Sequence, residues 1–217
     1  MTLHVALIGR NGFVVASDRL RTWGTIGNPN NPQRSHAKKI YCKEPLICAF
    51  AGYNPHTHFI DELSKTVGTN PVLTESHLKE FSEGFFRRNP VAGIQPEEIL
   101  LGSANDLKQL WQIKVYKGNC IFINAFEDKA TNQAPVNAHF IPTLFFKRSS
   151  PVKQLVFLAA LTIWYGEQEN NGAIRGLQIV VCKRGVFREL DEAEIDSLTN
   201  RCVKFHKSVG DLMFGAG

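Results

Sequence analysis

The chain lacks the segments by which a protein enters or crosses a membrane. The most apolar stretch among its 217 residues is 155–164, about half of the roughly 20 residues that a membrane-spanning helix needs. The chain does not open with a basic region followed by a long apolar stretch, so we expect no signal peptide. The sequence therefore predicts a soluble protein with no membrane partner, and we expect a cytoplasmic location.

Cysteine is sparse, and its spacing excludes a disulfide framework. The number of cysteines is odd, and no two of them form a C-x-x-C pair. This usage is typical of reduced, mostly buried thiols. No recognisable local signature surrounds any of them, so a cysteine nucleophile has no support. The five residues are Cys42, Cys48, Cys120, Cys182 and Cys202.

Motifs for nucleotides, nucleic acids and metals are also missing. There is no P-loop and no G-x-G-x-x-G segment, so nucleotide binding has no support. The net charge of +5 is spread in short basic pairs, which we interpret as solvated loop ends and not as a nucleic-acid surface. His56 and His58 precede Asp61 and Glu62, but we interpret these residues as surface side chains. We expect no metal and no cofactor.

What the chain does contain is typical of one globular domain spanning residues 1–217. Hydrophobic residues make up 43% and charged residues 21% of the chain, which allows a sizeable core. Hydrophobic periodicity and turn residues predict the order ββββ-αα-βββ-α-ββ-α, an α+β fold. Residues 127–150 follow no clear pattern, and the polar stretch 25–35 predicts an exposed loop. Strands are expected at 3–8, 13–17, 39–42, 46–50, 99–104, 109–116, 120–126, 177–182 and 186–190, and helices at 54–68, 74–88, 151–165 and 191–209.

The first two predicted strands form a hairpin that brings Thr2 close to Asp18. Two strand-forming apolar runs flank Arg10-Asn11-Gly12, and Asn-Gly between such runs is a strong hairpin signal. Folding at this turn places residues 17–21 beside residues 2–4.

A lysine heads the third predicted strand, and either Lys38 or Lys39 could occupy that position. Successive side chains of a strand point to opposite faces, so only one of the two can face Thr2. The sequence alone leaves this choice open.

These residue types suit a nucleophile at the chain terminus. A threonine hydroxyl is a poor nucleophile and needs a base within hydrogen-bond reach. If the initiator Met1 is removed, as is usual before a small residue, the α-amine of Thr2 becomes that base, since its ordinary pKa is about 7.7–8.0. A nearby lysine would lower this pKa, and a carboxylate would keep the lysine charged and oriented.

Four short segments resemble the opening of proteasome β-type subunits and their bacterial relatives, which are N-terminal-nucleophile hydrolases. Their order and approximate spacing are similar over residues 2–66. The segments are Thr2, the Gly-Phe-Val-Val-Ala-Ser-Asp-Arg run at 12–19, Lys-Lys-Ile-Tyr at 38–41 and Ala-Phe-Ala-Gly at 49–52.

The resemblance implies a four-layer α-β-β-α sandwich of two antiparallel sheets and the activity of a threonine endopeptidase. Thr2 would be the nucleophile, with Asp18 and Lys39 beside it; we favour Lys39 over Lys38 because it directly precedes the Ile-Tyr pair of the motif. Gly52 would donate its backbone N–H to the oxyanion. Thr22 would bind the substrate strand through main-chain hydrogen bonds.

The chain departs from the family pattern in two places. The Ser-Gly-Ser/Gly segment that supports the terminal amine has no counterpart in residues 127–146, and we expect the outer helix there to be short or missing. Where the family carries an Asp and a Ser before late glycines, this chain has Glu167 and Asn170 ahead of Gly172. We expect these two residues to form an altered supporting shell, which bears more on peptidase activity than on the fold.

The resemblance also implies partners: like subunits in a self-compartmentalised ring, an unfolded polypeptide as substrate, and an ATPase or cap that delivers it. Phe59 and Phe86 on the first two helices suit either subunit contacts or internal packing. Two alternatives to the peptidase stay open. One is a catalytically inactive scaffold subunit, and the other is a hydrolase of small non-peptide amides.

Overall fold

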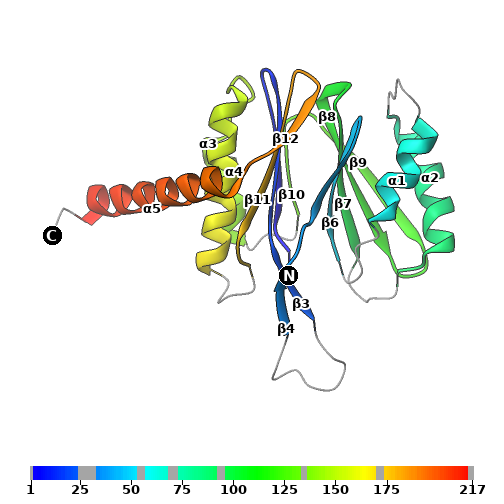
Figure 1. Ribbon diagram of the computed structural model, residues 1–217, viewed down its shortest axis with the longest axis horizontal. Coiled ribbons are helices and arrows are strands. Elements are labelled where there is room, and N and C mark those ends of the chain that lie inside the picture. Colours follow the sequence, from blue (N-terminus) through cyan, green and yellow to red (C-terminus); the bar gives the residue numbers. More distant parts are fainter. Residues whose placement is uncertain are drawn as a thin grey trace.

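Two stacked antiparallel sheets with helices on both outer faces make up the protein (Figure 1). This computed structural model describes residues 2–23, 33–52, 57–67, 73–91, 96–132, 136–169 and 174–214. The predicted α+β class and the four-layer α-β-β-α sandwich are confirmed.

Each of the two main sheets has five strands. The first sheet has the order β10-β1-β2-β11-β12, and the second has the order β5-β6-β7-β8-β9. The strands of the first sheet are β1 His4–Gly9, β2 Gly12–Asp18, β10 Lys129–Asn132, β11 Leu177–Lys183 and β12 Val186–Glu189. Those of the second are β5 Ile40–Lys43, β6 Leu46–Ala51, β7 Glu97–Ser103, β8 Asp106–Tyr116 and β9 Cys120–Phe126.

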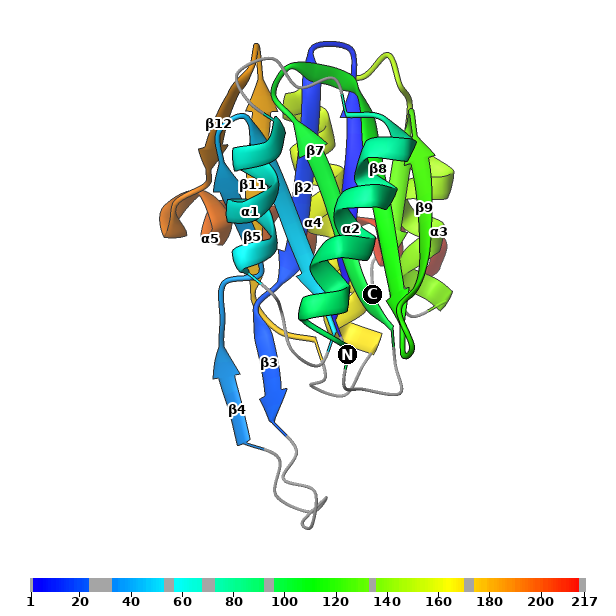
Figure 2. The ribbon, with the colours of Figure 1, turned by 90° about the vertical axis from the view of Figure 1, so that its right-hand side faces the viewer.

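Five described helices cover the sheets. The helices α1 His58–Val67 and α2 Glu75–Arg88 lie side by side over the second sheet (Figure 2). The first sheet is covered by α4 Val152–Glu169, beside which lie α3 Val136–Phe145 and α5 Glu192–Phe214. None of these described helices is both long and apolar enough to cross a membrane.

Strand β1 shows why the opening of the chain is so apolar. Its residues Val5 and Leu7 face α4, whereas Ala6 and Ile8 face the layer between the sheets. A strand buried on both faces carries an almost continuous apolar run instead of an alternating one.

The second sheet has its own core under α1 and α2, which contains Phe59 and Phe86 at 0% exposure. Of the two alternatives left open for these phenylalanines, the structure therefore supports internal packing and not subunit contacts. They pack internally because the helix pair buries its aromatic face against the sheet.

The opening hairpin forms where it was predicted, but its turn differs. Gly9 pairs with Gly12, so Arg10 and Asn11 make the turn and Gly12 is the first residue of β2. Gly12 has a φ of +149°, and a Cβ there would lie 2.0 Å from the carbonyl oxygen of Cys182 on β11. This close approach of backbone requires glycine.

Several elements were missed or misjudged from the sequence. Part of the predicted loop at 25–35 is strand β4 Gln33–His36, which pairs with β3 Leu20–Trp23 in a projecting hairpin (Figure 2). The region 127–150 contains β10 and the ten-residue α3, so the outer helix is not missing. Helix α4 continues to Glu169, beyond the predicted end at residue 165.

Candidate active site

Thr2 and Asp18 meet because the pairing of β1 with β2 continues before the first residue of β1, His4. The N–H of Leu3 donates to Asp18 Oδ1 at 2.9 Å, and the N–H of Asp18 donates to the Leu3 carbonyl at 3.1 Å. The other carboxylate oxygen, Oδ2, accepts a hydrogen bond from the N–H of Leu20 at 3.1 Å. Backbone groups therefore hold the Asp18 carboxylate beside residue 2, as the hairpin predicted.

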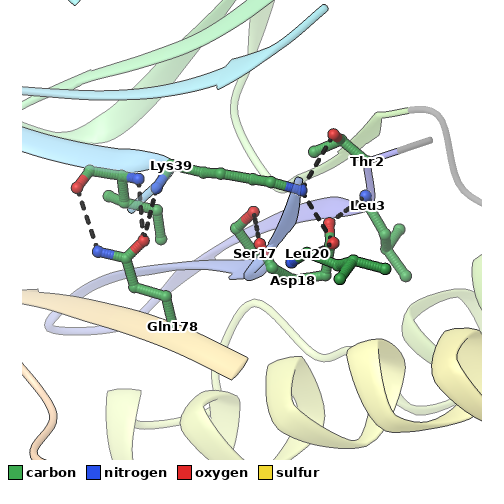
Figure 3. Close-up of polar contacts among 8 residues, drawn as sticks. Thr2, Leu3, Ser17, Asp18, Leu20, Lys39 and Gln178 are labelled. Atoms are coloured by element: carbon green, nitrogen blue, oxygen red, sulfur yellow. Dashed lines mark hydrogen bonds and ion pairs between the residues drawn. The ribbon is translucent and has the colours of Figure 1, made fainter. Parts of the chain in front are cut away.

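Lys39 joins the pair from the second sheet (Figure 3). Its Nζ lies 2.8 Å from Asp18 Oδ2 and 3.1 Å from Thr2 Oγ1. Thr2 is 8%, Lys39 7% and Asp18 0% exposed, so the three groups are largely withdrawn from solvent. The result is a buried ion pair in contact with a hydroxyl group.

The structure decides between the two adjacent lysines. Lys38 points outward and pairs with Glu189 at 2.8 Å, and both side chains of that pair are exposed. Lys39 points inward because neighbouring residues of an extended segment face opposite sides. The residue favoured from the sequence is the one that contacts Thr2.

Burial dominates the electrostatics of Asp18. It raises the pKa of the Asp18 carboxyl, while the Lys39 charge and the hydrogen bonds from Lys39, Leu3 and Leu20 oppose that shift. A buried carboxylate is costly unless it is paired and hydrogen-bonded. The ammonium and the two backbone N–H groups meet that requirement here.

Gly52 directly follows β6, at the same end of the sheets as Lys39. Two residues before it, the N–H of Phe50 donates to the Lys39 carbonyl at 3.0 Å. Gly52 has a φ of +148°, and a Cβ there would lie 1.9 Å from Oε2 of Glu97. The positive φ favours glycine, whereas the Glu97 carboxylate lies at the end of a flexible side chain that could move aside. Gly52 is exposed, and its role as an oxyanion donor stays a prediction.

Comparisons with known proteins show the fold but not the activity. No protein-family model and no curated protein matches the chain. Among solved structures, Anbu (ancestral beta-subunit) from Yersinia bercovieri has a TM-score of 0.69 and 14% identity, covering 99% of this chain and 98% of that one. A Gly-1 mutant of Anbu from Hyphomicrobium sp. strain MC1 has a TM-score of 0.70 and 13% identity, covering 98% and 99%. A second Anbu structure from the same strain has a TM-score of 0.66 and 13% identity, covering 96% and 97%.

The chain has a proteasome-like fold. The similarity extends over almost the whole of both chains, so it includes both sheets and the helical layers.

Of the expected supporting residues, Glu167 lies near the site. It is half-buried on the last turn of α4. Burial raises its pKa; the charge of Arg175 and the N–H of Gly176 oppose this shift, and the negative charge of Asp18 adds to it. The preceding Gly166 packs so tightly on Leu3 that a Cβ would lie 2.5 Å from Leu3 Cδ2.

Two other residues expected to act at the site stay untested. Asn170 lies outside the described residues, as does residue 54, at which the first helix was expected to begin. Thr22 lies on β3, where it is paired with Arg34 of β4, and its proposed contact with substrate remains a prediction.

Sequence reasoning missed two buried polar residues near Lys39. His4 is 0% exposed, and burial together with the Lys39 charge lowers its pKa to about 3, so its ring is neutral at ordinary pH. Gln178 is 4% exposed and accepts hydrogen bonds from the backbone N–H groups of Lys39 and Ile40. A signal was available, because each is a lone polar residue within an apolar strand-forming run.

Proposed function

We propose that this chain is an N-terminal threonine hydrolase that cleaves peptide bonds in unfolded polypeptides. One observation carries the proposal: Lys39 Nζ contacts both Thr2 Oγ1 and the Asp18 carboxylate in a largely buried site. A hydroxyl beside a salt-linked ammonium, one residue from the chain start, is the arrangement that an N-terminal nucleophile needs.

The proposed mechanism requires removal of Met1. The free α-amine of Thr2 then takes the proton from Oγ as this oxygen attacks the carbonyl carbon of the substrate. The ammonium of Lys39 favours the developing negative charge on Oγ, and Asp18 keeps that ammonium charged and oriented. The N–H of Gly52 stabilises the oxyanion.

The reaction then completes in two transfers. The terminal amine passes its proton to the leaving amine, which departs as the new N-terminus of the product. Water next attacks the ester formed on Thr2, with the amine again acting as base, and releases the second product. Threonine is regenerated with its hydroxyl protonated.

The proposal is tested by mass spectrometry and by substitution of Thr2. We expect the intact mass to lack Met1 and a threonine-directed electrophile to add to Thr2. Thr2→Ala should abolish hydrolysis of unfolded protein, whereas Thr2→Ser should retain part of it because the hydroxyl remains. Thr199→Ala, which changes a half-buried threonine on α5, is a matched control and should keep wild-type activity. Unchanged hydrolysis by Thr2→Ala would exclude the mechanism.

A second candidate is an inactive scaffold subunit of the same fold. It is favoured by residues 127–146, which contain neither serine nor glycine where the resembled family places its Ser-Gly-Ser segment. Retained Met1 together with no adduct on Thr2 would support the scaffold. If Thr2 is labelled but peptides are not turned over, assays on small amides test the third possibility, a hydrolase of non-peptide substrates.

We further propose that like subunits assemble into a ring, to which an ATPase or cap delivers substrate. The support is an apolar surface on α3, where Phe140, Leu144 and Phe145 are 55%, 68% and 52% exposed. Exposed apolar clusters of this kind are typical of protein interfaces. Native mass spectrometry should detect an oligomer, and Leu144→Glu should weaken it; a wild-type monomer at micromolar concentration would contradict assembly.

A further inference from the structure

Gln178 connects the two sheets at the level of the candidate site. It lies on β11 of the first sheet, and its side chain reaches the backbone at the start of β5 in the second sheet (Figure 3). Its 4% exposure places the amide group almost entirely out of water. A buried amide is stable there only if its polar atoms have partners.

Four hydrogen bonds satisfy this amide. Gln178 Oε1 accepts from the N–H of Lys39 at 2.9 Å and from the N–H of Ile40 at 3.0 Å. Its Nε2 donates to the Ile40 carbonyl at 3.2 Å and to Glu189 Oε1 at 2.7 Å. A glutamine side chain has two acceptor sites and two donor hydrogens, so its hydrogen-bonding capacity is fully used.

Glu189 determines which way the amide points. An ionised carboxylate can only accept hydrogen bonds, so the amide NH2 of Gln178 must face it and the Gln178 oxygen must face the N–H groups of Lys39 and Ile40. The second oxygen of Glu189 is 2.8 Å from the Nζ of Lys38. One continuous set of contacts therefore runs from Lys38 on the surface through Glu189 and Gln178 to the backbone of Lys39.

The same contacts fix the backbone from which the Lys39 side chain departs. Gln178 binds the N–H of Lys39, and the N–H of Phe50 binds its carbonyl at 3.0 Å. A slip of one residue would turn Lys39 outward and bring Lys38 to the inner face, since side chains alternate along an extended strand. We infer that Gln178 is a positioning residue that holds Lys39 in register with Thr2 and Asp18.

This inference rests on the proposed function for its kinetic consequence, but its geometry can be tested without activity. If Gln178 only satisfied its own buried amide, replacing it would lower stability and leave the turnover of folded protein unchanged. If it positions Lys39, replacing it lowers kcat and leaves KM nearly constant, because Gln178 has no described contact with Thr2 or with the exposed backbone of Gly52.

The first test compares two buried glutamines. Gln178→Met keeps a side chain of similar shape but removes all four hydrogen bonds. Because a displacement of about 1 Å can cost on the order of 100-fold in rate, we expect kcat to fall by about that factor. Gln112→Met is the matched control: Gln112 is 6% exposed on β8 and its amide contacts Glu98 at 3.5 Å. We expect it to lose stability while keeping the kcat of the wild type.

The second test exchanges the two partners. In the double variant Gln178→Glu/Glu189→Gln, the carboxylate at 178 can still accept from the Lys39 and Ile40 N–H groups, and the amide at 189 can donate to it, although the hydrogen bond to the Ile40 carbonyl is lost. The double variant should therefore recover part of the kcat that Gln178→Met loses, whereas Gln178→Glu alone should not, since it places two carboxylates together. Equal kcat for the wild type and Gln178→Met would overturn the inference, as would equal losses for Gln178→Met and Gln112→Met.

Hydrogen exchange followed by NMR on the full chain separates this inference from the proposed function. The amides of Lys39 and Ile40, at the start of the edge strand β5, should be protected in the wild type, and in Gln178→Met they should exchange faster while amides of the central strands keep their protection. If Gln178→Met does not fold, the wild-type measurement and the exchanged double variant still decide the matter. Unprotected Lys39 and Ile40 amides in the wild type would overturn the inference, whereas protected amides in a protein without hydrolase activity would contradict only the proposed function.

Discussion

The middle of the sandwich and the end that holds Thr2 are buried to the same degree but differ in chemistry. In the middle, the layer between the sheets contains apolar side chains such as Ile8, Phe13 and Leu110 at 0–1% exposure. At the end, Asp18 at 0% and Lys39 at 7% exposure form an ion pair.

Burial has opposite consequences in these two regions. Removing apolar surface from water stabilises the fold by about 25 cal/mol per Å². Removing charges from water costs free energy that an ion pair and its hydrogen bonds only partly return. The apolar middle therefore stabilises the protein, and the polar end is retained at a cost, which is the pattern expected of a functional site.

Lys39→Met should have the largest effect, because it leaves the Asp18 carboxylate buried without its cation. Losing one partner of a buried pair lowers the free energy of unfolding by about 3–5 kcal/mol. Hydrolysis should also disappear. Adding Asp18→Asn should restore much of the stability but none of the activity. Urea denaturation measures the free energy of unfolding, and peptide assays measure hydrolysis. A Lys39→Met protein with wild-type stability and turnover would show that the two regions do not differ in this way.

Leu110→Ala should destabilise the apolar middle without touching the chemistry. A buried Leu→Ala substitution costs about 3 kcal/mol through lost transfer energy and the cavity left behind. Because Leu110 has no described contact with the ion pair, kcat per folded molecule should stay at the wild-type value below the unfolding transition. A loss of kcat in fully folded Leu110→Ala would show that the two regions are coupled.

His4 should make stability depend on pH. The unfolded chain takes up a proton near the ordinary histidine pKa of 6.5, whereas the folded protein does so only near pH 3. Protons therefore favour the unfolded state in this window, and stability falls by about 1 kcal/mol per pH unit as the pH drops below 6.5. His4→Leu removes this titration. Denaturation at several pH values should show that the free energy of unfolding falls more steeply with decreasing pH in the wild type than in His4→Leu. Equal pH dependence in the two proteins would contradict the prediction.

Lys38→Met should have the smallest effect, although Lys38 is adjacent to Lys39 and also forms a salt bridge. An exposed ion pair contributes about 0–1 kcal/mol, so the free energy of unfolding should fall by no more than about 1 kcal/mol. Hydrolysis should remain near the wild-type level, as Gln178 still holds the Lys39 backbone. The same denaturation and peptide assays apply, and a loss as large as that of Lys39→Met would mean that the two lysines share one role.

Local patterns were sufficient for most of the elements. Thr74 caps α2 through a hydrogen bond to the N–H of His77, and Asp191 and Glu194 cap α5 reciprocally. Such signals act within one turn of helix, so they can be read without knowledge of the fold. The hairpin that brings Thr2 beside Asp18 likewise follows from a local signal, its turn sequence.

The missed elements depend on partners elsewhere. Strand β10 has four residues and pairs with β1, from which it is far removed in sequence. Helix α3 contains Pro142, and strands β3 and β4 form a hairpin outside the two main sheets. Short strands and a proline-containing helix carry little hydrophobic periodicity. Their formation depends on packing partners that the sequence does not reveal.

By itself, the sequence determined the two-sided apolar strands, the turn between them and the meeting of Thr2 with Asp18, because these follow from contacts between near neighbours. Only the tertiary structure decided which lysine faces Thr2, and it brought in His4 and Gln178. Those outcomes depend on how the second sheet lies on the first. A shift of one residue in that packing would exchange a buried cation for an exposed one without altering any local pattern.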